Sequence, residues 1–159
     1  HVENHLARYA LVELENLHDD SQQFEPIHRV ITGTDVQELI EAMKEQCCGE
    51  NGQEIRCYYG NKEEVLHLNL HEHQLAVDKV QIFLDEYLKE NSGVIDYIHG
   101  EDVLRKLASQ ENAVGIELPA MEKDQLFPSV MTDGTLPRKT FSMGHASEKR
   151  YYIEGRAIK

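Results

Sequence analysis

The chain has 159 residues, of which 40% are hydrophobic and 28% charged, and this composition is typical of one globular domain rather than of a disordered or fibrous protein. Its net charge of −13 repels phosphate backbones, so we expect no nucleic-acid partner. No run of about 18 apolar residues is present, so the sequence predicts no membrane span. We therefore expect a single domain over residues 1–159.

Two further features concern the origin of the chain. The three cysteines, Cys47, Cys48 and Cys57, have no metal or disulfide spacing, which indicates reduced thiols in a cytoplasmic protein. The sequence begins at His1 without an initiator Met. We expect it to be a fragment of a longer protein.

The first predicted elements are two strands. Residues 8–14 (RYALVEL) are apolar on both faces in the middle, as in the interior of a sheet. Residues 24–31 (FEPIHRVI) contain Pro26, which favours an extended segment at a sheet edge or a strand entry.

The next element is a helix over residues 36–47. Its apolar residues recur at helical spacing, Thr34 and Gln37 have the spacing of a capping box, and Gly49 is placed to end the helix. Strands over 55–59 and 64–70 follow, and Gly60-Asn61-Lys62 between them predicts a β-hairpin.

The second half of the chain alternates helices and strands. The predicted elements are a helix over 73–89, a strand over 94–98, a helix over 102–109 and a strand over 113–118. The strand-helix-strand run predicts a parallel pair with a right-handed crossover. In residues 121–131, Pro128 indicates one or two short helical turns rather than a continuous helix, closed by Asp133-Gly134. A loop and a last strand over 150–158 complete the chain.

Together these elements predict an α+β (mixed α/β) fold. We expect a central mixed sheet of five to seven strands with a hairpin, flanked by two longer and two or three short helices.

The loop before the last strand concentrates positive charge. Residues 135–159 hold six Lys and Arg against two Asp and Glu, whereas residues 1–134 hold 10 against 27. Cations, short hydroxyl donors and a glycine within one loop are what an anion site needs. The predicted anion-binding residues are Arg138, Lys139, Thr140, Ser142, Gly144, His145, Lys149 and Arg150. The alternative is a surface loop whose cations pair with the acidic body.

Two histidines are candidates for catalysis. His28 has an ordinary pKa near neutrality and could act as a general base, and His99 lies where a predicted strand runs into a helix, a place where ligands gather in open sheets. The candidates for supporting roles are Glu25, Arg29 and Asp96. Strand alternation places His28 and Arg29 on opposite faces. The alternative for His28 is a histidine satisfied by a neighbouring carboxylate, and the alternative for Asp96 and His99 is that one of them caps the following turn.

His67, His71 and His73 could hold a transition metal if the strand and the turn after it converge. Their spacing does not match the helical zinc motif of two histidines four residues apart. Surface histidines in a turn are the commoner alternative, and we predict no metal ion.

Four blocks of the sequence resemble one known family. They are RYALVEL (8–14), FEPIHRV (24–30), DYIHG (96–100), and LPRKTFSMGHA (136–146) continued by KRYY (149–152). They are similar to the C-terminal half of the bacterial family called domain of unknown function 1015, whose members are two to three times this length. The resemblance implies that a His-containing motif upstream, in surroundings similar to a group that includes nucleotide-dependent kinases, is missing here.

Three functions follow as hypotheses. In the first, the domain forms part of a phosphate- or nucleotide-type anion-binding cleft that the N-terminal half of the same protein completes, with phosphate or a nucleotide as the ligand. In the second, it is a non-catalytic regulatory or protein-interaction module whose basic segment docks on an acidic partner or on another copy, as a homo-oligomer. The third is a metal-binding domain built on the histidine cluster.

Overall fold

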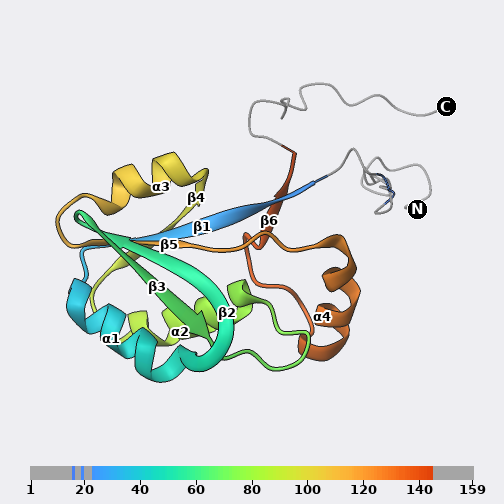
Figure 1. Cartoon of the computed structure of the whole chain (residues 1–159). Helices are drawn as coiled ribbons and strands as arrows, with labels where there is room; N and C mark the ends of the chain where they lie inside the picture. The colour runs from blue at the N-terminus through green and yellow to red at the C-terminus, as the bar shows by residue number, and fades with distance from the viewer. Residues whose placement is uncertain (1–15, 17–18, 20–22, 145–159) are drawn as a thin grey trace, which may run out of the picture.

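The computed structural model describes residues 16, 19 and 23–144, and the strands predicted over 8–14 and 150–158 lie outside these residues. The described elements, in chain order, are β1 (Phe24–Thr32), α1 (Val36–Cys47), β2 (Cys48–Tyr59), β3 (Lys62–Leu68), α2 (Ala76–Glu90), β4 (Val94–His99), α3 (Glu101–Ala108), β5 (Ala113–Glu117), the 3-10 turn η2 (Lys123–Gln125), α4 (Leu126–Asp133) and β6 (Phe141–Met143). One sheet with helices packed around it confirms the predicted α+β class (Figure 1).

The sheet is organised around β1. Its strand order is β3-β2-β5-β1-β4, and β6 pairs with the first residues of β1 through Phe24, Glu25 and Pro26. Every pairing among the described strands is antiparallel. The parallel pair predicted for β4 and β5 is therefore corrected: both strands pair antiparallel with β1, so they run parallel to each other but β1 lies between them.

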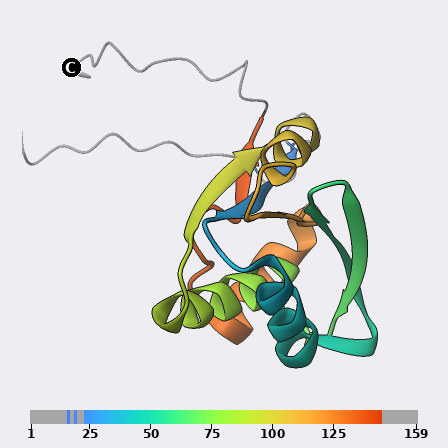
Figure 2. The same ribbon diagram turned by 90° about the vertical axis from the view of Figure 1, so that its left-hand side faces the viewer.

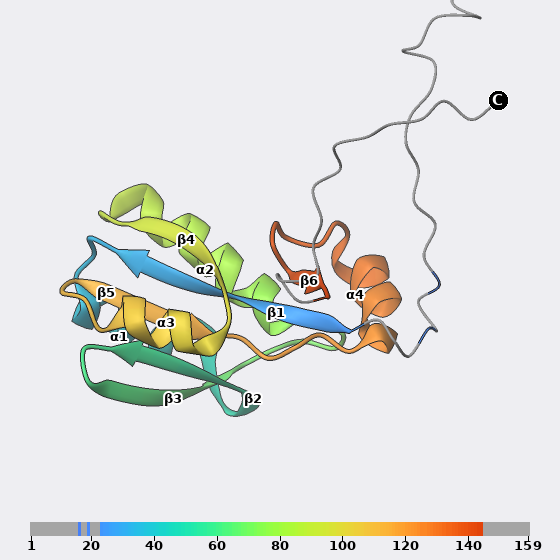
Figure 3. The ribbon, with the colours of Figure 1, turned by 90° about the horizontal axis from the view of Figure 1, so that it is seen from above.

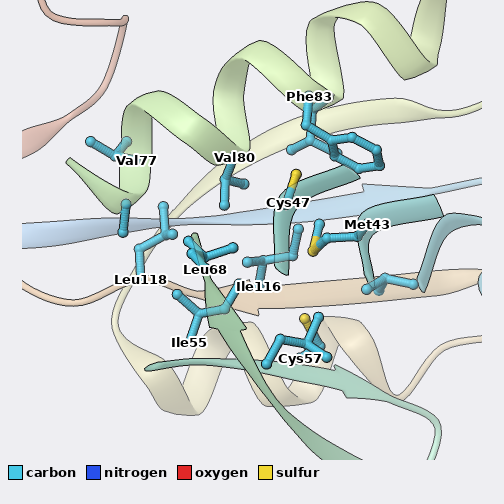
Figure 4. Close-up of a cluster of buried hydrophobic side chains, with 14 of the residues drawn as sticks. Met43, Cys47, Ile55, Cys57, Leu68, Val77, Val80, Phe83, Ile116 and Leu118 are labelled. Carbon is cyan, nitrogen blue, oxygen red and sulfur yellow. The ribbon is translucent and has the colours of Figure 1, made fainter. Parts of the chain in front are cut away.

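Helices cover the two faces of the sheet unequally. Helices α1 and α2 lie against one face and the short α3 lies against the other, as Figures 2 and 3 show. The α1/α2 side holds the larger core, which includes Ile31 and Leu84. Figure 4 shows part of this core, with Met43, Val80 and Ile116 among the labelled side chains. The α3 side holds a smaller cluster of Val30, Tyr58, Ile98, Leu104 and Ala108. From His28 to Ile31, alternation along β1 thus sends odd residues toward α2 and even residues toward α3.

The start of α1 differs from the predicted capping box. The Asp35 carboxylate, not the Thr34 hydroxyl, accepts from the amides of Gln37 and Glu38, both at 3.0 Å. Thr34 is instead buried, and its hydroxyl forms no regular hydrogen bond with the described residues. The helix ends at Cys47 as predicted, but Gly49 is not its cap, because Cys48 is already extended and opens β2.

The hairpin of β2 and β3 is confirmed around Gly60, whose φ is +56°. Strand β2 is longer than predicted because a bulge between Cys48 and Gln53 lets both residues oppose Leu68. Helix α2 begins at Ala76 rather than at His73, which lies in the preceding turn with a left-handed φ of +67°.

Pro128 does not interrupt α4. The helix runs from Leu126 to Asp133 through Pro128, because a proline in the first helical turn loses an N–H that has no partner within the helix. The predicted end of the helix at Asp133-Gly134 is confirmed. Gly134 has a φ of +84°, and its amide donates to the Val130 carbonyl at 3.0 Å.

Candidate anion-binding site

The basic turn, defined here as residues 136–140, follows α4 and leads into β6. Strand β6 pairs with the start of β1, and the turn before it contacts Arg29 of β1 and Tyr97 of β4. The turn therefore lies beside the α2 face of these two strands. Arg138 and Lys139 are exposed at its tip, and Lys139 has a left-handed φ of +57°. The predicted residues His145, Lys149 and Arg150 lie outside the described residues.

Arg29 of β1 holds the basic turn from beneath. Its side chain is 0% exposed, and its guanidinium donates to the carbonyl oxygens of Lys139 at 2.9 Å and Arg138 at 3.1 Å. It also donates to the Ile27 carbonyl and, through Nε, to Gln81 Oε1 of α2 at 3.2 Å. Arg29 therefore joins three segments that are more than 50 residues apart in sequence.

Arg138 covers the outer side of the same site. Its Nε donates to the Tyr97 hydroxyl of β4, and its Nη2 lies 2.9 Å from Asp85 Oδ1 of α2. The Tyr97 ring has two cations near it, with the Arg29 guanidinium 5.0 Å and the Arg138 guanidinium 5.7 Å from its centroid. Both distances are within the range of a cation–π interaction.

The charges at this site do not cancel. No carboxylate in the described part of the chain forms an ion pair with Arg29, and Asp85 pairs with Arg138 alone. Burial, with a smaller contribution from Arg138, lowers the pKa of Arg29 to about 10, although Tyr97 and Asp85 act in the opposite direction. A group with that pKa is still cationic at pH 7. Arg29 and Arg138 thus share one nearby carboxylate, Asp85, and the exposed Lys139 adds a further cation to the turn, in a chain that is strongly acidic overall.

The predicted hydroxyl donors are partly used inside the turn. Thr140 Oγ1 donates to the Pro137 carbonyl at 2.6 Å, and Ser142 Oγ lies 3.4 Å from the Gly144 carbonyl. Both side chains are buried. Thr140 lines one cavity together with Leu75 and Ala120, whereas Arg138 and Lys139 are exposed at the surface.

His99 and Glu25 form an ion pair on the same sheet face as Tyr97. His99 Nε2 contacts Glu25 Oε2, and both side chains are less than a quarter exposed. Asp96 is exposed, and its carboxylate accepts from the Tyr97 amide at 2.7 Å. His99 therefore pairs with Glu25, and Asp96 lies inside β4, where it contacts the next amide of the strand. Neither side chain caps the start of α3, whose N-cap is Gly100.

His28 lies on the opposite face of β1, as alternation predicts. It is 5% exposed, and its Nδ1 accepts from the Leu118 amide at 3.1 Å. This contact places the proton of the neutral ring on Nε2. Burial lowers the pKa of His28, although Glu117 and Glu101 act in the opposite direction. His28 and His99 are therefore not brought to one site.

A second polar cluster on the α3 side was not predicted. Tyr58 donates to Glu117, and Arg105 Nη2 of α3 donates to the Tyr58 hydroxyl at 2.7 Å. The Arg105 guanidinium lies 4.0 Å above the Tyr58 ring and its Nε lies 2.6 Å from Glu101. These contacts attach α3 to the sheet.

The three candidate metal ligands point to different partners. His71 Nε2 lies 3.2 Å from Asp133 Oδ1, His73 Nε2 lies 3.7 Å from Glu72 Oε1, and His67 is exposed on β3. Within the described part of the chain, no group of three or more His, Cys, Asp or Glu is arranged to hold a metal ion.

Sequence reasoning missed three residues of the site: Tyr97, Gln81 and Asp85. Tyr97 belongs to a block quoted for the family resemblance, but nothing in the residue itself indicated a contact with arginines. Gln81 and Asp85 are four residues apart on α2, and Gln81 Nε2 donates to Asp85 Oδ1 at 2.9 Å. That spacing was a usable signal for a polar patch on one helix face.

The comparisons with known proteins concern the family. The family model described as "Protein of unknown function (DUF1015)" matches residues 1–152. The searches of curated proteins and of solved structures gave no match. None of the described helices has the length and apolar character needed to cross a membrane.

Proposed function

The chain belongs to the DUF1015 family, and from its geometry we propose that the domain binds an anionic group of the phosphate class, free or as part of a nucleotide, on the surface formed by Arg138 and Lys139 above the buried Arg29. The Arg29 guanidinium carries this proposal. It is fully buried, and within the described residues it has carbonyl and amide partners but no carboxylate.

Buried charges in proteins are usually paired, because an isolated ion loses its hydration without compensation. The carbonyl oxygens that Arg29 contacts offer only partial charges. An anion next to the basic turn would supply the missing negative charge. Because Arg29 is buried, the anion would contact Arg138 and the basic turn, which lie between the anion and Arg29.

Arg138 is the residue that would contact the anion directly. Its side chain is 59% exposed, and Asp85 accepts from only one of its terminal nitrogens. A guanidinium has five N–H donors in a planar fork, and phosphate accepts two of them in parallel. Asp85 is thus a competitor for the anion rather than a permanent partner.

Arg138 and Lys139 are exposed in the part of the chain that the structure describes, and we propose that further parts of the protein complete the site. The candidates are His145, Lys149 and Arg150, together with the N-terminal half that the family resemblance implies. If the completed site is catalytic, His99 is better placed than His28, because His99 shares the sheet face of Tyr97 and Arg29.

Thermal unfolding with sodium phosphate and with sodium chloride at equal ionic strength tests the proposal. We expect phosphate to raise the Tm of the wild-type domain more than chloride does. The excess should disappear in Arg138→Ala and persist in Arg56→Ala, since Arg56 is an exposed arginine that pairs with Glu54 on β2.

Asp85→Asn is expected to have the opposite effect on phosphate binding to that of Arg138→Ala. Because the substitution removes the competing carboxylate and keeps an acceptor for Gln81, we expect tighter phosphate binding than in the wild type. An equal response to chloride and phosphate in the wild type and in Asp85→Asn would contradict the proposal.

A second candidate function rests on α4. Phe127 is 64% exposed, Val130 39% and Met131 86%, and their i, i+3, i+4 spacing forms an apolar stripe on the solvent side of the helix. Exposed apolar patches of this kind mark interaction surfaces. We propose that the stripe is the docking site for the N-terminal half of the same protein.

Amide hydrogen exchange compares this domain with the longer protein. We expect the amides of α4 to exchange more slowly in the longer protein, whereas those of α3, on the far side of the sheet, should be unchanged. Equal exchange of α4 in both forms would overturn this second proposal. Phe127→Ser with Met131→Ser should abolish the added protection and leave the fold of the isolated domain intact.

A further inference from the structure

A separate cavity of about 260 Å³ lies between the start of α2 and the end of α4. Its walls differ in character. Ile82, Leu136 and Pro137 form an apolar side, whereas His71, Asp78 and Asp133 bring ionisable groups to it. Leu136 and Pro137 belong to the basic turn, but neither Arg138 nor Lys139 lines this cavity, so it is adjacent to the cationic surface described above and not part of it.

Asp78 is the most unusual of these residues. It is only 8% exposed, and its Oδ2 has no hydrogen-bond partner. The Leu75 amide bonds to the carboxylate, and the Ser129 hydroxyl lies near enough to favour its charged form. Even so, Ser129 Oγ has no regular hydrogen bond of its own. A buried carboxylate oxygen without a donor is costly, and such groups call for a ligand or another explanation.

The electrostatic environment of the cavity is negative. Burial raises the pKa of Asp78, and nearby Asp133 raises it further, which means that the two carboxylates are close enough to repel each other. Asp133 is also the last residue of α4, where the helix dipole is negative. Among the described residues that line the cavity, His71 is the one basic side chain, with its Nε2 at 3.2 Å from Asp133 Oδ1.

We propose that this cavity binds a small primary alkylammonium ion, with its NH₃⁺ group between the carboxylates of Asp78 and Asp133 and its carbon chain against Ile82, Leu136 and Pro137. An ammonium has three donors, enough to satisfy both carboxylates, and the apolar wall removes the alkyl chain from water. A divalent metal suits the site less, because no three ligands converge in the described residues.

Isothermal titration calorimetry with putrescine (1,4-diaminobutane) tests this proposal, with 1,4-butanediol as the neutral ligand of the same length. We expect one putrescine per chain and no detectable binding of butanediol. Asp78→Asn and Asp133→Asn should each weaken binding by about tenfold or more, since each leaves the ammonium without one of its counter-charges.

Glu86→Gln is the matched control. Glu86 is exposed on α2 and pairs with Lys89, away from the cavity, so the variant changes the net charge by the same amount without touching the site. Asp133→Asn keeps the proposal testable if Asp78→Asn fails to fold, because the Asp133 side chain is 27% exposed. Equal weakening in Glu86→Gln would show nonspecific attraction to the acidic protein. That result, the absence of putrescine binding, or equal binding of butanediol would overturn the proposal.

Discussion

Arg29 combines two roles that are usually separate: it is a buried charge, and it is the support of the basic turn. We predict that Arg29→Lys lowers the free energy of unfolding by about 3 kcal/mol. Lysine keeps the charge but cannot reach the carbonyls of Ile27, Arg138 and Lys139 with one planar fork. Urea unfolding measures the loss.

The exposed Arg56, whose side chain is 44% accessible, provides the comparison. Arg56→Lys should change the free energy of unfolding by less than about 0.5 kcal/mol. Similar losses for both substitutions would show that Arg29 stabilises the fold through its charge alone and not through its hydrogen bonds.

His28 predicts a specific dependence of stability on pH. Because burial lowers its pKa below the ordinary value of 6.5, the folded protein binds fewer protons than the unfolded chain below that pH. The contribution to stability is therefore complete above pH 6.5 and is lost as the pH falls from there toward the folded pKa.

Urea unfolding between pH 7.5 and 5.5 measures this effect in the wild type and in His28→Asn, which keeps an acceptor near the Leu118 amide. We expect the wild type to lose more stability than the variant over this range. Parallel pH profiles would contradict the predicted pKa shift, since all other titrating groups are common to both proteins.

At the scale of secondary structure, α3 depends on the absence of a side chain in β5. A Cβ atom on Gly115 would lie 2.9 Å from Ala108 Cβ and 3.1 Å from the Leu104 side chain. We predict that Gly115→Ala lowers the free energy of unfolding by about 1–3 kcal/mol, because α3 must move away from the sheet.

Ala108→Gly removes the nearest of those atoms, so the two substitutions should be coupled. We expect the double variant to be more stable, by about 1 kcal/mol, than the sum of the single losses predicts. Additive losses in urea unfolding would mean that the helix yields elsewhere and that the close contact does not set its position.

The elements that sequence predicted well are those with a local cause. Helix α1 and the hairpin around Gly60 follow from periodicity and turn chemistry within a few residues. The errors arose where two local causes compete: Thr34 and Asp35 both suit an N-cap, and Pro128 is a breaker in a helix interior but is tolerated in a first turn. The separation of β4 from β5 by β1 has no local signal, because it depends on pairing with a strand about 70 residues earlier.

The candidate site depends on the whole molecule, and sequence predicted only part of it. The concentration of cations after residue 135 was visible in the charge count, so Arg138 and Lys139 could be named. The contacts of Arg138 with Tyr97 and Asp85, which are 41 and 53 residues away, could not be, since they require the sheet order and the position of α2. Arg29 was named, but its burial beneath the basic turn has no signature in the residues around it.

The net charge of −13 over 159 residues leads to a prediction for the whole molecule. A chain so acidic repels itself more in the compact folded state than when unfolded. Raising sodium chloride from about 0.01 M to about 0.2 M shortens the Debye length from about 30 Å to under 10 Å, so we expect the Tm to rise.

The sign of this response distinguishes two electrostatic contributions. Ion pairs such as those of Arg105 with Glu63 and Glu101 are weakened by the same screening, and exposed pairs contribute little. A fall in Tm with added chloride would mean that such pairs outweigh the general repulsion. A rise with chloride in Arg138→Ala, equal to that of the wild type, would assign the effect to the overall charge and leave the response to phosphate as the specific measure of the basic turn.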